Sequence, residues 1–115
     1  MKITLIKEKR KISIDVKKTY FFSKVFGLMF RTRETNNLIF EFNNYTGMPF
    51  TALFCFFPFL LIWLDETNSV LGCRTVNPFE LTIKPKTKYR KVVEIPINDK
   101  NSKIIDFFVG KSRKI

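Results

Sequence analysis

The longest apolar segment of the chain, GMPFTALFCFFPFLLIWL at residues 47–64, contains no charged side chain. As an α-helix its 18 residues would span about 27 Å, so its length does not exclude a membrane-spanning helix. Pro58 lies in its middle, its first half favours Phe over Leu, and basic residues are balanced on its two sides. These features favour two buried strands, at about 51–57 and 59–65, and leave a membrane anchor as the alternative.

Alternating apolar and polar positions predict further strands before and after this segment. Phe22, Val25, Phe26 and Met29 recur at helical spacing and predict a short amphipathic helix within 19–31. A second short helix is expected over 103–110, after a polar start at 99–102 and with Gly110 at its end. The remaining predicted strands are two within 2–16, one at 38–42, one at 69–76 and one at 90–95.

These elements predict an α+β, mainly β fold. The length of 115 residues fits one domain, 1–115. With 45% hydrophobic and 27% charged residues, the composition is that of a globular protein and excludes disorder. Phe occurs 14 times, so we expect a core built largely from aromatic rings, centred on 51–64. The expected architecture is a compact, bent, barrel-like sheet, rich in antiparallel pairs, with one or two short helices.

The formal net charge of +11 permits nucleic acid, anionic lipid or an acidic protein as partner, without choosing among them. Cys55 and Cys73 are too far apart for a CxxC pair and lie among apolar neighbours, so we expect free, buried thiols. A run of charged residues begins at Lys7, so the N-terminus lacks the long apolar region that a secretory signal contains. The expected location is the cytoplasm, and the expected state is soluble rather than membrane-bound.

Several kinds of chemistry are excluded by residue type. The chain has no histidine, which removes Ser-His-Asp and Cys-His catalysis as well as histidine-ligated metals. Its four glycines are scattered, so there is no Gly-rich phosphate loop, and two cysteines are too few for a metal cage. We therefore expect no metal, no cofactor and no catalytic residues.

Three separated stretches carry a family resemblance. They are GLMFR at 27–31, FFPFLLIWLD at 56–65 with Val70 beyond the turn, and YRKVVEIP at 89–96 followed by KIIDFFVGK at 103–111. In this order they resemble the domain of unknown function 192 family, small prokaryotic proteins with many strands, over about 20–111. The resemblance implies a compact, soluble, mainly β domain with a short helix at the GLM motif. It implies no biochemical activity, since none is established for the family.

The chain departs from the family pattern at positions where relatives often carry polar groups. Thr51 or Ala52 stands where a histidine or similar residue is frequent, and Leu60 stands where an aspartate often follows the proline. Lys111 replaces the aspartate of a Gly-Asp pair. The resemblance implies that a site formed by those groups would be lost here.

Glu94 is the most informative carboxylate, because it lies within the predicted strand VVEI. A carboxylate in a partly buried strand needs a cationic partner, and Arg31 is the candidate, since both positions match the family pattern. We predict a structural salt bridge between them; a binding or catalytic site that uses the pair is the alternative. Asp65 is predicted to be a turn residue rather than a functional acid.

Lys84, Lys86, Lys88 and Arg90 recur at a period of two. On an extended segment they would share one face, where they could contact an anion or backbone phosphates. The structural interpretation is an edge strand that lysines keep from aggregating.

The sequence thus favours a non-enzymatic binding or interaction module, whose partner is an acidic protein or a small ligand. Weak, sequence-independent nucleic-acid binding through residues 84–91 is the first alternative. The others are a membrane-anchored protein, through residues 47–64, and a catalyst that uses Glu94, Asp65 and Arg31.

Overall fold

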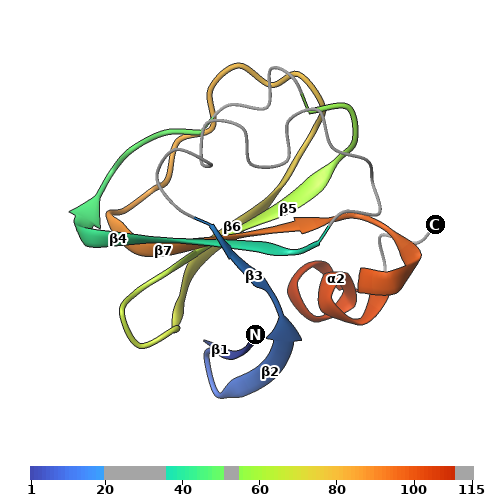
Figure 1. Cartoon of the computed structure of the whole chain (residues 1–115), viewed down its shortest axis with the longest axis horizontal. Helices are drawn as coiled ribbons and strands as arrows, with labels where there is room; N and C mark the ends of the chain where they lie inside the picture. Colours follow the sequence, from blue (N-terminus) through green and yellow to red (C-terminus); the bar gives the residue numbers. More distant parts are fainter. Residues whose placement is uncertain (20–35, 51–54, 111–115) are drawn as a thin grey trace.

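The computed structural model describes residues 1–19, 36–50 and 55–110. About half of them belong to strands, and one short α-helix lies near the end of the described part of the chain (Figure 1). The mainly β, α+β class expected from the sequence is therefore confirmed. The elements are β1 (Lys2–Lys7), β2 (Arg10–Asp15), β3 (Lys17–Thr19), β4 (Leu38–Thr46), β5 (Phe59–Leu64), β6 (Val70–Val76), β7 (Tyr89–Pro96), the 3₁₀ helix η1 (Asp99–Asn101) and α2 (Ser102–Val109).

The strands form two sheets. β1 and β2 make an antiparallel hairpin, and the other five make one sheet in the order β3-β4-β7-β5-β6. Within that sheet only the short β3–β4 pair is parallel. The sheet is open in the described part of the chain, because β3 lies at one edge and β6 at the other.

Both faces of the five-stranded sheet are covered. The β1–β2 hairpin and α2 lie on one face, where Leu5, Ile14 and Phe108 join the side chains of β5 and β7 (Figure 1). On the other face, Phe57 and Ile83 come from connecting segments and pack against the rings and aliphatic side chains of the sheet. Because covered strands need no polar face, all six residues of β5 are buried without alternation.

The central apolar segment is only partly a pair of strands. Its second half forms β5, as predicted. Residues 51–54 lie outside the described part, and the strand predicted through residue 57 is wrong for 55–57, where the chain bends. There the Cys55 thiol donates a hydrogen bond to the Phe57 carbonyl, and Pro58 lacks an N–H for a sheet ladder. In the described ranges, no helix has the length and apolar character that a membrane span requires.

The other predicted elements are mostly confirmed. The two strands within 2–16 pair in register from Lys2 with Asp15 to Lys7 with Arg10. β4 continues beyond the predicted end at residue 42, and its pairing with β7 resumes at Thr46 with Tyr89 after a register shift that begins at Glu41. The C-terminal helix ends before Gly110, whose φ of 95° favours glycine. The helix predicted within 19–31 lies almost entirely outside the described residues.

Candidate functional site

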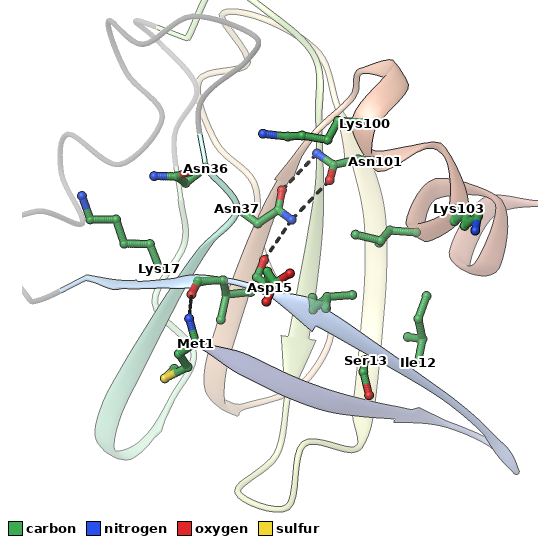
Figure 2. Close-up of a pocket in the computed structure, with 13 residues that line it drawn as sticks. Met1, Ile12, Ser13, Asp15, Lys17, Asn36, Asn37, Lys100, Asn101 and Lys103 are labelled. Atoms are coloured by element: carbon green, nitrogen blue, oxygen red, sulfur yellow. Dashed lines mark hydrogen bonds between the residues drawn. The ribbon is translucent and has the colours of Figure 1, made fainter.

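A concave surface in the described structure lies between the β1–β2 hairpin and the start of the C-terminal helical segment. We call it the hairpin–helix groove; it has a volume of about 750 Å³ (Figure 2). Residues from β2, the start of β3, the segment before β4, η1 and α2 all contribute to it. Its lining consists of Met1, Ile12, Ser13, Ile14, Asp15, Val16, Lys17, Asn36, Asn37, Lys100, Asn101, Lys103 and Ile104.

Two buried amides hold the sides of the groove together. Asn37 Nδ2 donates to Asn101 Oδ1 at 3.2 Å, and Asn101 Nδ2 donates to Asn37 Oδ1 at 3.0 Å. Asn37 Nδ2 also donates to the Asp15 carbonyl at 3.1 Å (Figure 2), and Asn101 Nδ2 donates to the Pro96 carbonyl at 2.8 Å. The pair therefore joins the end of β2, the start of β4 and the end of β7 in one network.

Local sequence sets the position of Asn101. The Asn98 side chain accepts a hydrogen bond from the Asn101 N–H at 2.9 Å, which is the N-cap interaction of η1. On the other side, the Lys17 N–H donates to the Asn37 carbonyl at 2.7 Å, where β3 enters the sheet beside β4. Both amides are fixed by backbone as well as by each other, so the base of the groove is rigid.

The rim of the groove is basic. Lys17, Lys100 and Lys103 line it and are exposed, whereas Asp15 is the single carboxylate in its described lining. In Figure 2 the lysines come from different sides of the groove, with Asp15 near its centre. Lysine ammonium groups are point charges that suit phosphate and carboxylate ligands. This arrangement can attract an anion and supply hydrogen-bond donors to it.

Loss of the amide network should be costly. For Asn101→Ala we expect the free energy of unfolding to fall by about 2–3 kcal/mol, because Asn37 and the Pro96 carbonyl lose partners while buried. The measurement is urea unfolding. Asn36→Ala, at an exposed position in the same groove, is the matched control and should change the free energy by less than about 0.5 kcal/mol. Equal effects of the two substitutions would contradict a structural role of the network.

No local sequence pattern predicts the contact between Asn37 and Asn101. Asn37 directly precedes the strand predicted at 38–42, and Asn101 lies in the polar helix start predicted at 99–102; both predicted elements are present. Their contact joins residues 64 positions apart. An asparagine that will be buried and paired has the same local sequence pattern as one in an exposed turn, so only the fold brings the two together.

Glu94 lies on β7 between Leu38 of β4 and Leu61 of β5, facing the aromatic side of the core. Burial raises the pKa of Glu94 to about 8, so the carboxyl is neutral at pH 7. Among the residues that the structure describes, its Oε1 atom has no hydrogen-bond partner, and the same holds for Nε1 of Trp63 on the same face of the sheet. The expected partner Arg31 lies outside the described residues, so the predicted salt bridge stays a prediction.

Asp65 organises the turn between β5 and β6. Its Oδ1 atom accepts hydrogen bonds from the N–H of Thr67 at 2.8 Å, the Thr67 hydroxyl at 2.7 Å and the N–H of Ser69 at 3.0 Å. Desolvation alone would raise the pKa of Asp65, but these hydrogen bonds outweigh it and lower the pKa. Asp65 is four residues along from Leu61, the partner of Glu94, which is about 13 Å of strand. The structure does not bring these two carboxylates together.

The four basic residues at 84–90 do not form one stripe. The chain bends at Lys86 and Thr87, and β7 begins only at Tyr89. Lys84, Lys86 and Lys88 are exposed, whereas Arg90 is half-buried, donates to the Phe42 carbonyl and lies 3.9 Å from a Glu66 oxygen. An extended edge strand is therefore wrong for 84–88.

Lys84 and Lys86 line a second concave surface, of about 320 Å³, which we call the β6 pocket. It lies between β6 and the 84–87 segment, with the buried Trp63 of β5 as one wall. Its other lining residues are Leu71, Gly72, Cys73, Arg74, Pro85 and Thr87.

Of the remaining candidate positions, the structure describes only Leu60. Leu60 is fully buried among apolar side chains, whereas Thr51, Ala52 and Lys111 lie outside the described residues. Over 1–19, 36–50 and 55–110, no three Cys, Asp or Glu side chains gather as metal ligands would.

Comparisons with known proteins agree with the fold. A protein of unknown function from Novosphingobium aromaticivorans DSM 12444 has a similar crystal structure, with a TM-score of 0.74 and 17% identity, over 90% of this chain and 76% of that one. A candidate transcription regulator from Sinorhizobium meliloti 1021 gives a TM-score of 0.75 and 15% identity, over 90% of this chain and 84% of that one. At such identities the likeness shows the fold alone.

A comparison with curated proteins found no match. The model of the DUF192 family, described as "Uncharacterized ACR, COG1430", matches residues 2–104. This match includes the GLMFR, FFPFLLIWLD and YRKVVEIP stretches and extends the resemblance to the β1–β2 hairpin. The chain therefore belongs to the DUF192 family.

Proposed function

We propose that this chain is a non-enzymatic binding module whose partner is anionic and binds in the hairpin–helix groove. The observation that carries the proposal is the large groove with three exposed lysines on its rim and one carboxylate in its described lining. The amide groups of Asn37 and Asn101 are used by each other and by the backbone, so they shape the groove. Charge attraction supplies the affinity, and the rigid base limits the entropic cost of binding.

Reversal of two groove charges should weaken anion binding. For Lys100→Glu/Lys103→Glu we expect the Kd for inorganic pyrophosphate to rise by about tenfold or more at low salt, because attraction becomes repulsion. Isothermal titration calorimetry measures the effect. Lys9→Glu/Lys11→Glu is the matched control: it makes the same change in net charge at exposed hairpin positions outside the groove lining. Equal weakening by both variants would assign the binding to net charge and overturn the groove.

Nucleic-acid binding is the second candidate. It is favoured by the exposure of Lys84, Lys86 and Lys88. It is also favoured by two exposed rings, Phe56 and Phe79, which pack edge to face with their centroids 5.4 Å apart. Exposed aromatic rings and basic side chains are the two components of sites for single-stranded nucleic acid. If this candidate holds, the affinity for a single-stranded oligonucleotide falls steeply with salt, and Lys84→Glu/Lys86→Glu removes the binding.

A further inference from the structure

The two edges of the five-stranded sheet differ in how they are protected. β3 has three residues, two of them lysines, which is a common way to keep an edge from pairing with another strand. β6 has seven residues, VLGCRTV, of which only Arg74 is charged. A long edge strand with so little charge is a template for a further strand. The difference indicates that β6 is the edge at which a further strand could pair.

The backbone of β6 is available on its outer side. Among the described strands, β5 is its only neighbour in the sheet, and alternate N–H and C=O groups of an antiparallel edge strand point away from that neighbour. Within the described part of the chain, no backbone hydrogen bond outside the regular strand pairs involves residues 71–75. An extended peptide could therefore pair with this stretch.

The β6 pocket lies beside this edge and is large enough for one apolar side chain. Gly72, opposite Trp63 in the strand register, leaves part of the indole uncovered by a β6 side chain. A Cβ atom at Gly72 would lie 3.7 Å from Trp63 Cε3, which is ordinary contact, so a larger side chain there would occupy the pocket rather than break the strand. Strand addition gains specificity when alternate side chains enter such pockets.

The charges beside the pocket select the partner. Lys84 and Lys86 are exposed at its rim, whereas Arg74 is held by Glu80 at 2.6 Å. The two lysines complement acidic side chains. A second copy of this chain would bring its own net charge of +11 and its own lysines to the same edge, which opposes self-pairing.

We propose that β6 accepts an extended segment of an acidic partner protein by strand addition, with one apolar side chain in the β6 pocket and acidic side chains beside Lys84 and Lys86. This surface is separate from the hairpin–helix groove: the two share no lining residue. The proposal stands whether or not the groove binds an anion.

The probe is a peptide of about eight residues that alternates glutamate and valine, tested on the full chain by fluorescence anisotropy and backbone hydrogen exchange. We expect saturable binding, with exchange slowed at residues within 71–75, and no binding of the matching lysine–valine peptide. Gly72→Val should weaken binding about tenfold by filling the pocket, and Lys84→Glu/Lys86→Glu by a similar factor through charge. Lys9→Glu/Lys11→Glu, at exposed hairpin positions that line neither concave surface, should leave it unchanged.

Four results would overturn the proposal. They are the absence of peptide binding, binding without slower exchange at 71–75, slower exchange there that depends only on chain concentration, and binding of single-stranded RNA instead of the peptide. The third result would assign the edge to a second copy, and the fourth would assign the lysines to nucleic acid. The lysine variant changes exposed side chains in a connecting segment, so it gives a result even if Gly72→Val fails to fold.

Discussion

Glu94→Gln is expected to stabilise the protein at pH 8 and to change its stability little near pH 4.5. In the folded state burial raises the pKa of Glu94 to about 8 from its usual value of 4.5. Between these two values the folded state binds the proton more tightly than the unfolded state, so the contribution of Glu94 to stability falls as pH rises. The slope reaches about 1.4 kcal/mol per pH unit. Glutamine remains neutral and removes this loss.

The measurement is the free energy of unfolding by urea at several pH values between 4.5 and 8. Glu8→Gln, in the exposed hairpin turn, is the matched control and should follow the wild type at every pH. The difference between Glu94→Gln and wild type should widen steadily toward pH 8. Parallel profiles would show that Glu94 is ionised in the folded protein and would contradict the rise of its pKa by burial.

Phe59→Ala is expected to lower the free energy of unfolding by about 3–5 kcal/mol. Phe59 begins β5, is 2% exposed and packs in the aromatic cluster, so the substitution leaves a cavity that the surrounding strands cannot close. Phe56→Ala, three residues earlier in the same apolar segment, is the matched control. Phe56 is 57% exposed and meets Phe79 at its edge, so we expect a loss of less than about 1.5 kcal/mol.

Chemical unfolding of both variants measures the contrast. The structure requires a large difference between two phenylalanines that the sequence pattern alone does not distinguish. Similar costs at positions 56 and 59 would contradict the boundary between the exposed bend and the buried strand.

Much of the fold could be predicted because local sequence signals and the pattern of burial indicate the same strands and helix. The hairpin follows from alternation at Ile12 and Ile14, and the final helix from the polar start before Lys103 and the stop at Gly110. β5 could be predicted as doubly buried because it contains no polar side chain. The bend at 55–57 could not, since Phe-rich sequence favours a strand equally on both sides of Pro58.

Less of the candidate sites could be predicted. The period of two at 84–90 predicts a shared basic face only if the chain is extended there. The chain instead bends at Lys86, so Lys84 and Lys86 line the β6 pocket. Arg90 contacts Phe42 and Glu66. The groove depends on Asn37 and Asn101, which meet only in the folded chain. Spacing along the sequence carries no information on such long-range contacts.

The central claim, that the hairpin–helix groove binds an anionic partner, is tested most directly by backbone amide NMR during titration with pyrophosphate at low salt. We predict saturable chemical-shift changes concentrated at Lys17, Asn37 and residues 100–103, with the signals of 84–88 nearly unchanged. Shifts concentrated at 84–88, or spread over all exposed lysines without saturation, would contradict the claim.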